Sequence, residues 1–369
     1  VLQAVLVAAR ARIGYCSDVA ALTDAMKALR PTLIVAVPRV FEKLINTAAH
    51  RAAEAGKSAI FDRAVATACD YSRGLDSGRV GLSLRLRHAL FNRLVYSKLR
   101  ATLGGDLQWA VSGGAPLGER LGHAFRGMGI TVLEGYGLTE TSAGTTVNRP
   151  HHPAGPGLRI GTVGRPVPGT AVRIAEDGEV QLLGPHIFRE YWNNPTATAD
   201  TFTADGWFRT GDLGSLDDDG FLRITGRAKE LIVTAGGKNV APAVLEDPIN
   251  ASFLVATSMV VGDARPFVAA LVTLDHEALR LWLRSHNLPE TTAVADLVNN
   301  SDLRAEIQRA IDTANLQVSK AEQIKKFAVL PHEWTIAGGQ ITPSMKLKRS
   351  VVTQQHAADI DALYAGGND

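Results

Sequence analysis

Cysteine is scarce in this chain of 369 residues, which contains only Cys16 and Cys69. The two show neither metal-ligand nor redox spacing, so we interpret them as reduced thiols and expect a cytoplasmic protein. An excess of one charge is also absent, and the formal net charge of +2 does not indicate nucleic-acid binding. The apolar residues 1–9 are too few to span a bilayer and have no basic leader, so they favour a core helix over a signal peptide.

Apolar strands that alternate with helical segments dominate the first part of the chain. Residues 32–37, 109–112 and 130–133 are short apolar runs typical of buried parallel strands, and residues 39–100 are helical and basic. This alternation predicts an α/β fold with a doubly wound sheet, in which ligands bind beyond the carboxyl ends of the strands. A further short strand is expected near Arg12.

Beyond residue 155 the chain changes to short strands and turns rich in glycine, proline and aspartate. Residues 171–174, 179–183 and 221–224 predict antiparallel strands of a small β-barrel. The run Asp217-Asp218-Asp219-Gly220 lacks the spacing and the terminal Glu of a calcium loop, so it predicts a hairpin turn. A smaller α+β domain is expected to follow, with strands near residues 231–233, 259–262 and 267–272 and helices near 275–286, 293–298 and 301–319. The predicted domains are 1–228, with the barrel-like portion at about 155–225, and 229–369.

The most informative segment comes directly after the apolar run 130–133 and contains Gly135, Tyr136, Gly137, Thr139 and Glu140. Glycine lets the backbone approach a ligand closely. Tyr136 offers a flat face for a base, and Thr139 offers a hydroxyl and an N–H for a phosphate oxygen. Glu140 supplies the hard oxygen that Mg²⁺ prefers. Taken alone, the segment is also compatible with an ordinary turn after a strand, because turns rich in Gly and Thr are common.

Further blocks carry related chemistry. The loop Ser112-Gly113-Gly114-Ala115-Pro116 lacks bulky side chains, so a planar base could lie against its backbone. Asp212 follows a tight glycine turn and can accept hydrogen bonds from both hydroxyls of a ribose, although an Asp that caps a turn is the alternative. Arg227 is a permanent cation suited to ribose or phosphate oxygens. Lys346 can supply the point cation that activation of a carboxylate requires, although basic clusters near a C-terminus are usually solvated.

Together these blocks resemble the adenylate-forming superfamily of acyl-CoA synthetases, adenylation domains and luciferases. The run Val37-Pro38-Arg39-Val40-Phe41-Glu42-Lys43-Leu44 and the basic helical insert after it look like bacterial long-chain fatty-acyl-CoA synthetases. The resemblance implies a ligase that converts a fatty acid and ATP to acyl-AMP and pyrophosphate, with Mg²⁺ as cofactor, and then transfers the acyl group to coenzyme A. It implies Lys346, not Lys348, as the catalytic lysine, together with Thr139 and with Glu140 as the Mg²⁺ ligand.

The same resemblance implies residues that bind the nucleotide and coenzyme A, and a small domain that moves. Lys229 is implied as the hinge about which a small mobile domain swings between the two half-reactions. Gly236, Gly237 and Lys238 are implied as the loop that binds coenzyme A. The nucleotide-binding residues implied by the resemblance are Gly113, Gly114, Ala115, Pro116, Glu134, Gly135, Tyr136, Gly137, Thr139, Asp212 and Arg227.

One feature of the family is not found in residues 1–369, the Ser/Thr/Gly-rich loop ending in Lys-Gly that grips the β- and γ-phosphates. We therefore interpret the chain as N-terminally truncated and expect it to be inactive by itself. An acyl-AMP ligase or adenylation domain that loads a carrier protein, a luciferase-like oxygenase and a non-catalytic AMP-binding module stay open as alternatives. The basic residues 79–100 indicate a solvated helix face or, as the alternative, weak association with a membrane surface. No pattern indicates an oligomeric state.

Overall fold

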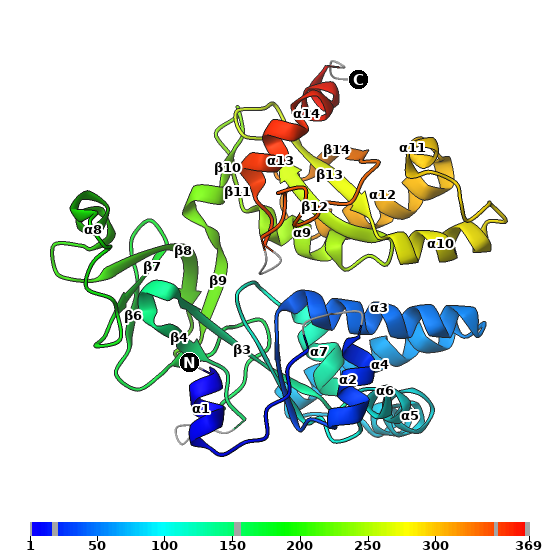
Figure 1. Cartoon of the computed structure of the whole chain (residues 1–369), viewed down its shortest axis with the longest axis horizontal. Helices are drawn as coiled ribbons and strands as arrows, with labels where there is room; N and C mark the ends of the chain where they lie inside the picture. Colours follow the sequence, from blue (N-terminus) through cyan, green and yellow to red (C-terminus); the bar gives the residue numbers. More distant parts are fainter. Residues whose placement is uncertain (1, 17–20, 151–155, 343–345, 366–369) are drawn as a thin grey trace. The chain divides into compact units, whose positions relative to one another are not determined.

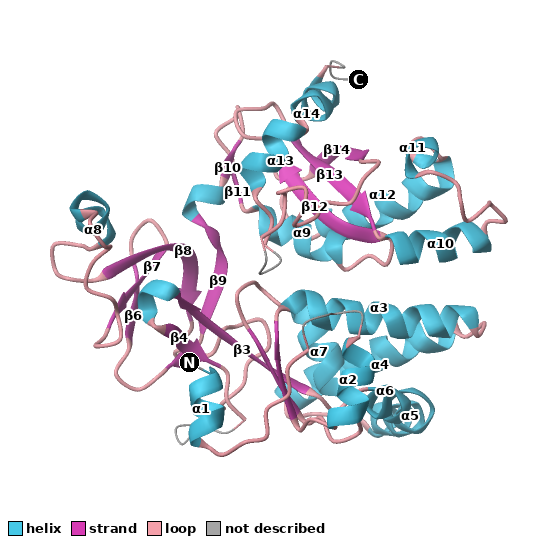
Figure 2. Cartoon of the chain, in the orientation of Figure 1, coloured by secondary structure: helices cyan, strands magenta, loops and turns pink. Residues whose placement is uncertain are grey.

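The structure is a computed structural model that describes residues 2–16, 21–150, 156–342 and 346–365. The chain divides into two compact units, Val1–Ile224 and Thr225–Asp369 (Figure 1). Both units combine helices with strands (Figure 2). The division between them falls inside the last strand of the small barrel.

The first unit contains a five-stranded sheet in which three parallel strands are followed by two antiparallel ones. Its register pairs Leu33 with Trp109 and Ser112 with Glu134, so the parallel strands run side by side toward one edge. The predicted α/β class is confirmed. In spatial order the strands are β1 (Leu33–Ala36), β2 (Trp109–Ser112), β3 (Thr131–Leu138), β4 (Ala143–Val147) and β5 (Arg165–Pro166).

Helices occupy the connections between these strands. The helix that joins β2 to β3 packs against the second helix of the long connection, and a Cβ on Gly127 would lie 2.0 Å from the Ala68 carbonyl oxygen, so this contact requires glycine. The predicted strand near Arg12 is wrong, because that segment is mostly exposed and pairs with no strand. The helices are α1 (Leu2–Ala8), α2 (Leu22–Leu29), α3 (Pro38–Glu54), α4 (Ser58–Asp76), α5 (Leu82–Phe91), the π-helical η1 (Asn92–Tyr96), α6 (Ser97–Thr102) and α7 (Glu119–Gly127).

The predicted antiparallel strands form a four-stranded half-barrel around a small core of Val180, Leu182, Phe208 and Leu222. The strands are β6 (Ala171–Ile174), β7 (Glu179–Leu183), β8 (Phe208–Leu216) and β9 (Leu222–Arg227), with α8 (Pro195–Thr201) between β7 and β8.

The aspartate-rich turn that connects β8 to β9 is a hairpin, as predicted. Asp217 Oδ1 accepts hydrogen bonds from the backbone N–H groups of Asp219 and Phe221 at 3.0 and 2.8 Å. Arg159 forms ion pairs with both Asp217 and Asp219. Gly220 takes a positive φ of 79°, which glycine adopts without strain. The carboxylates of Asp217 and Asp219 therefore stabilise the turn itself.

The second unit is built on a three-stranded sheet in the order β12-β13-β14, in which β13 and β14 are parallel. Sequence analysis predicted β12, β13 and the three middle helices but none of α9, β14, α13 and α14. The elements are the 3₁₀ turn η3 (Ala228–Glu230), β10 (Ile232–Val233), β11 (Asn239–Val240), α9 (Pro242–Asn250), β12 (Val255–Val261), β13 (Val268–Leu274), α10 (His276–Ser285), α11 (Val294–Leu297), α12 (Ser301–Asn315), β14 (Ile324–Val329), α13 (Arg349–Gln355) and α14 (Ala357–Tyr364).

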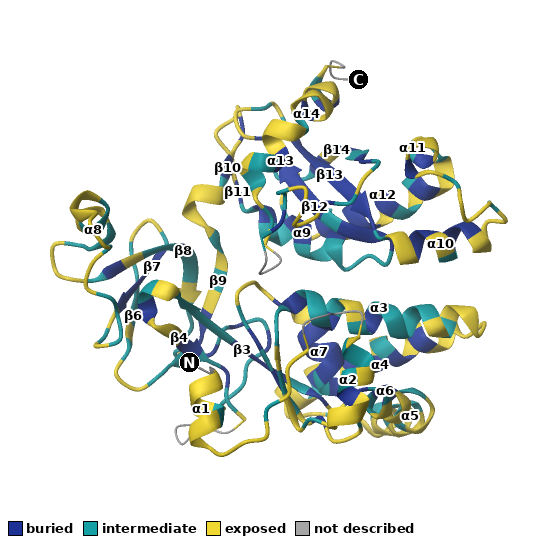
Figure 3. Cartoon of the chain, viewed as in Figure 1, coloured by how far each residue is buried: buried dark blue, intermediate teal, exposed yellow. Residues whose placement is uncertain are grey.

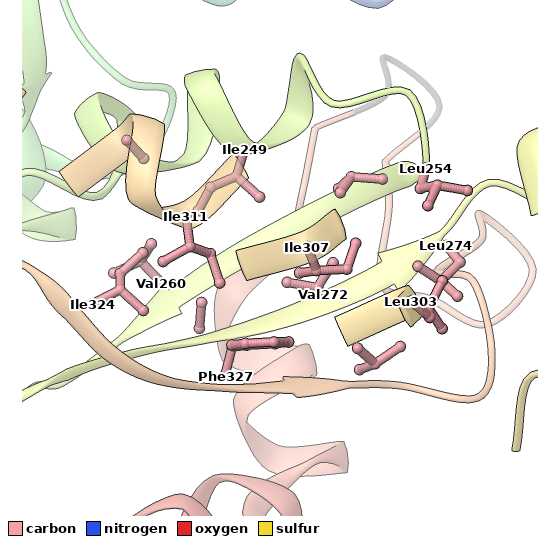
Figure 4. Close-up of a cluster of buried hydrophobic side chains, with 14 of the residues drawn as sticks. Ile249, Leu254, Val260, Val272, Leu274, Leu303, Ile307, Ile311, Ile324 and Phe327 are labelled. Atoms are coloured by element: carbon pink, nitrogen blue, oxygen red, sulfur yellow. The ribbon is translucent and has the colours of Figure 1, made fainter. Parts of the chain in front are cut away.

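Helices cover both faces of this sheet, which explains why β13 is buried along its whole length (Figure 3). Val260 and Val272 face a core shared with α9, α10 and α12, and Figure 4 shows Ile249, Ile307 and Ile311 converging on them. The alternate residues, such as Met259 and Leu271, face a second core made with Trp334, α13 and α14. Because both faces of β13 are buried, both sets of alternating side chains must be apolar, which explains the near-continuous apolar run.

A partly buried ion pair, whose carboxylate is buried, ties the two helical layers of this unit together. Arg349, the first residue of α13, donates to both carboxylate oxygens of Glu246 on α9, with Nη1 2.8 Å from Oε1. The same Glu246 oxygen accepts the backbone N–H of Val260 on β12 at 2.7 Å. The Nε atom of Arg349 lies 3.5 Å from a carboxylate oxygen of Glu230. We name Arg349, Glu246 and Val260 the α9–α13 clasp.

Breaking the clasp is predicted to destabilise the second unit. The Arg349→Met substitution leaves the buried Glu246 carboxylate without its cation, so the free energy of unfolding of this unit should fall by about 3 kcal/mol or more. Arg265→Met is the matched control, because the pair of Arg265 with Asp361 is exposed and should contribute less than about 1 kcal/mol. Urea unfolding followed by tryptophan fluorescence measures both, and equal losses in the two variants would contradict the prediction.

Candidate nucleotide-binding site

Two glycine-containing segments meet at the carboxyl edge of the parallel strands. Residues 113–116 leave β2 directly after Ser112, which lies opposite Glu134 in the register of β3. A Cβ on Gly113 would lie 3.3 Å from the Gly135 carbonyl oxygen, so the two backbones are in close contact. Gly114 takes a positive φ of 86°, which turns the chain away from the strand. The loop and the segment predicted beside it therefore lie side by side.

The segment from Gly135 to Leu138 is strand rather than turn, which corrects the sequence-based interpretation. It extends β3 and pairs with β4, with Tyr136 opposite Thr146. The pairing is so close at Gly137 that a Cβ there would lie 1.7 Å from the Ala143 carbonyl oxygen. Only Thr139–Thr141 form a short 3₁₀ turn (η2), in which the Thr139 side chain is exposed.

Tyr136 and Asp212 are in direct contact. The phenol Oη of Tyr136 donates a hydrogen bond of 2.6 Å to Oδ2 of Asp212, which lies on β8 and is 3% exposed. The backbone N–H of Asp212 donates to Oγ1 of Thr210 at 3.1 Å, and that hydroxyl donates to the Val180 carbonyl on β7. The five-stranded sheet and the half-barrel are therefore joined at the residue predicted to hold a ribose.

Glu140 is held by two residues of the segment between β7 and α8, Phe188 and Tyr191. The Tyr191 Oη donates to Glu140 Oε1 at 2.9 Å, and the Phe188 backbone N–H donates to the Glu140 carbonyl at 2.7 Å. Burial raises the pKa of the Tyr191 phenol, and the hydrogen bond to Glu140 raises it further. The Tyr-Trp-Asn-Asn-Pro run around Tyr191 was the only signal in the sequence, and it did not reveal this contact.

Glu134 connects β3 to the loop that follows β2. Its Oε2 accepts a hydrogen bond of 3.1 Å from the backbone N–H of Leu117, which directly follows the loop 113–116, and the side chain is buried. Burial raises the pKa of the Glu134 carboxyl from its ordinary value of 4.5 to about 7. This hydrogen bond therefore ties β3 to the residue that ends the loop after β2.

The remaining predicted residues lie on the second unit. Arg227 ends β9, and Lys229 lies in the exposed turn η3. Gly236, Gly237 and Lys238 form the tip of the β10–β11 hairpin, where Gly237 has a φ of 76° and the Nζ of Lys238 lies 3.6 Å from a carboxylate oxygen of Glu322.

Lys346 is exposed, and its backbone is hydrogen-bonded to Thr342. Its carbonyl accepts the backbone N–H of Thr342 at 2.8 Å, and its own N–H donates to the Thr342 hydroxyl at 3.0 Å. Ile341 and Leu347 form an antiparallel bridge beside it. Pro343, Ser344 and Met345, which belong to the same predicted motif, lie outside the described residues.

At the carboxyl edge of the parallel strands, few protein groups are available to bind a metal ion. Among the described residues, no three His, Cys, Asp or Glu side chains come together in a way that could hold a metal ion. A single carboxylate such as Glu140 fits Mg²⁺ only where phosphate oxygens and water complete the coordination, which is how proteins commonly bind this ion. The described helices also include none with the length and apolar composition needed to cross a bilayer.

Comparison with known families decides what this arrangement is. The model of the AMP-binding enzyme family matches residues 3–192, and that of the AMP-binding enzyme C-terminal domain matches residues 229–368. The chain belongs to the AMP-binding enzyme family. The recognition of the adenylate-forming superfamily from its motifs is thereby confirmed.

Relatives of this AMP-binding chain include named fatty-acid ligases. It is 53% identical over 352 residues to the long-chain-fatty-acid–CoA ligase FadD15 of Mycobacterium tuberculosis, covering 95% of this chain and 58% of the relative. It is 32% identical over 371 residues to the human long-chain-fatty-acid–CoA ligase ACSBG1, covering 93% and 50% respectively. The chain thus spans little more than half the length of these relatives.

The fold is shared with solved adenylation domains. The A domain of a carboxylic acid reductase from Segniliparus rugosus, solved in complex with AMP and a co-purified carboxylic acid, superimposes with a TM-score of 0.69 at 21% identity. The match covers 95% of this chain and 50% of that one. At this identity the likeness establishes the fold, and it confirms the predicted combination of sheet domain, small barrel and α+β domain.

The buried Glu134 predicts a specific pH dependence. A carboxyl whose pKa is about 7 when folded and 4.5 when unfolded stabilises the fold fully below pH 4.5 and loses that stabilisation as the pH rises to 7. The loss amounts to about 3 kcal/mol, and Glu134→Gln should remove it. The free energy of unfolding of the first unit, measured from pH 4 to 8, checks this.

The control for Glu134→Gln is Glu176→Gln, which makes the same chemical change at an exposed turn of the first unit. Its pH profile should run parallel to that of the unsubstituted chain. A profile of Glu134→Gln that also runs parallel would show that Glu134 is not the group responsible.

Proposed function

We propose that this chain takes part in the ATP-dependent activation of a long-chain fatty acid to acyl-AMP and in the transfer of the acyl group to coenzyme A. The observation that carries the proposal is the Tyr136–Asp212 pair at the carboxyl edge of the sheet, beside the loop 113–116. The names of the relatives, which are long-chain-fatty-acid–CoA ligases, support the substrate class.

The adenine is proposed to lie between the loop 113–116 and the Tyr136 ring, with Gly135 and Gly137 giving access to the backbone. Asp212 would accept the ribose hydroxyls, because its carboxylate is already oriented by the Tyr136 phenol. Arg227 would add a cation for ribose or phosphate oxygens. Thr139 would donate to a phosphate oxygen from its exposed position on η2. Glu134 would fix the position of the loop 113–116 through its hydrogen bond with the Leu117 backbone.

Mg²⁺ would be held by Glu140, oriented by Tyr191, together with phosphate oxygens. When bound, the ion would neutralise charge on the phosphates during displacement of pyrophosphate. Lys346 would supply a cation to the reacting carboxylate and the α-phosphate, which its exposed position permits.

The second half-reaction is assigned to the second unit. We propose Lys229 as the hinge in the exposed turn η3 and Gly236, Gly237 and Lys238 as the loop for coenzyme A. A domain boundary at 228, with residues 229–369 as the moving part, belongs to the same proposal. Because a long-chain fatty acid partitions into bilayers, association with a membrane surface is included as well.

The nucleotide part of the proposal predicts that the chain binds AMP and that Asp212→Asn weakens binding. Loss of hydrogen bonds from the ribose to a charged acceptor should raise the Kd by about tenfold to a hundredfold, as measured by isothermal titration calorimetry. Asp205→Asn is the matched control, because Asp205 is an exposed aspartate of the same unit that pairs with Arg173. Equal affinities for AMP in the two variants would refute the role of Asp212.

The catalytic part predicts binding without turnover for residues 1–369 alone, since they include no loop of the type that grips the β- and γ-phosphates. Exchange of labelled pyrophosphate into ATP with palmitate should stay at background, although AMP binds. Exchange above background would contradict this expectation. Absence of AMP binding would instead count against the nucleotide site itself, so the two failures are distinguishable.

A further inference from the structure

The outer face of α5 carries a line of exposed leucines that no part of the proposed reaction uses. Leu82, Leu86, Leu90 and Leu94 are 74%, 65%, 56% and 46% exposed. We name these four residues the leucine stripe. The first three recur every four residues and therefore share one side of the helix. The wider π-helical turn η1 advances the chain by a smaller angle per residue, which keeps Leu94 on that side.

The opposite face of α5 fixes the orientation of the stripe. The His88 ring stacks on Tyr71 of α4, with ring centroids 3.7 Å apart. Its Nε2 lies 2.6 Å from the carbonyl oxygen of Gly127 at the end of α7. Leu84 and Phe91 are partly buried on the same side. The stripe therefore lies on the side of α5 opposite the side that packs against α4 and α7.

The charge around the stripe has a single sign. Residues 77–105 contain no Asp or Glu. Arg85 and Arg87 flank Leu86 at about 100° on either side of the helix axis. The exposed basic residues are Arg79, Arg85, Arg87, Arg93 and Lys98, and none of them pairs with a carboxylate of the described chain. The sixth, Arg100, turns inward and donates to the Met128 carbonyl.

We propose that the leucine stripe and its flanking arginines dock this chain on an anionic lipid surface, with α5 lying in the plane of the interface. An exposed apolar line bordered by cations matches a layer of acyl chains below negatively charged headgroups. A second copy of the same face is a poorer partner, because it would bring like charges together. This inference deepens the membrane association included in the proposed function, and it rests on α5 and its neighbours rather than on the nucleotide site.

Vesicle sedimentation of the full 369-residue chain tests the proposal. We expect binding to vesicles of equal parts phosphatidylglycerol and phosphatidylcholine, weaker binding at higher salt, and little binding to phosphatidylcholine alone. The Leu86→Gln, Leu90→Gln double variant should bind at least about tenfold more weakly. Arg85→Gln with Arg87→Gln should lower binding by a similar factor. Leu316→Gln, at an 86% exposed leucine of the second unit, is the matched control and should bind normally.

The substituted residues are exposed, so the thermal midpoint of each variant should be unchanged. A second measurement detects contact with lipid directly. The fluorescence of a Leu90→Trp variant should shift to the blue when vesicles are added and should be quenched by brominated lipid. Equal binding of the double variant and Leu316→Gln, or no preference for anionic vesicles, would overturn the proposal. The proposal would also be overturned if the unsubstituted chain bound no vesicles but formed a dimer, and the double variant were monomeric.

Discussion

The hydrogen bond from Tyr136 to Asp212 joins two sheets, and each sheet carries part of the proposed nucleotide site. Tyr136 comes from β3 of the parallel sheet, and Asp212 comes from β8 of the half-barrel. Both residues depend on local features for their position, since Gly137 permits β4 to approach β3 and Thr210 ties β8 to β7. The carboxylate is therefore oriented by the fold before any ligand arrives, which reduces the cost of ordering it on binding.

A second constraint acts within Thr225–Asp369. The α9–α13 clasp places the start of α13 against the sheet, and Lys346 precedes that start by only three residues. An antiparallel bridge between Ile341 and Leu347 also lies beside Lys346. Arg349 thus has a structural role, because its ion pair with Glu246 fixes the start of α13.

Strands and turns that follow from the local pattern of apolar and turn-forming residues were predictable from the sequence. The parallel strands, the barrel strands and the Asp217 hairpin follow from apolar runs and turn residues, and the family follows from its motifs. The contacts of Tyr191 with Glu140 and of Glu134 with Leu117 were not predictable, because each joins segments whose proximity only the folded chain defines. For the same reason Gly135 and Gly137 were taken as turn residues, when pairing with β4 makes them strand.

Some sequence-based predictions remain predictions. The hinge at Lys229, the coenzyme A loop at Gly236 and Gly237 and the chemical role of Lys346 rest on resemblance to the family, supported by the exposure of these segments in the structure. The nucleotide edge has the additional support of geometry, because four separate stretches of one unit converge there: the loop 113–116, the end of β3, Tyr191 and Asp212.

A crystal structure of this chain grown with AMP tests the central claim most directly. The account predicts the ribose hydroxyls within hydrogen-bond distance of the Asp212 carboxylate, with the Tyr136 Oη still donating to it, and the adenine against residues 113–116. An AMP molecule bound elsewhere, or a ribose at this edge that makes no contact with Asp212, would contradict it.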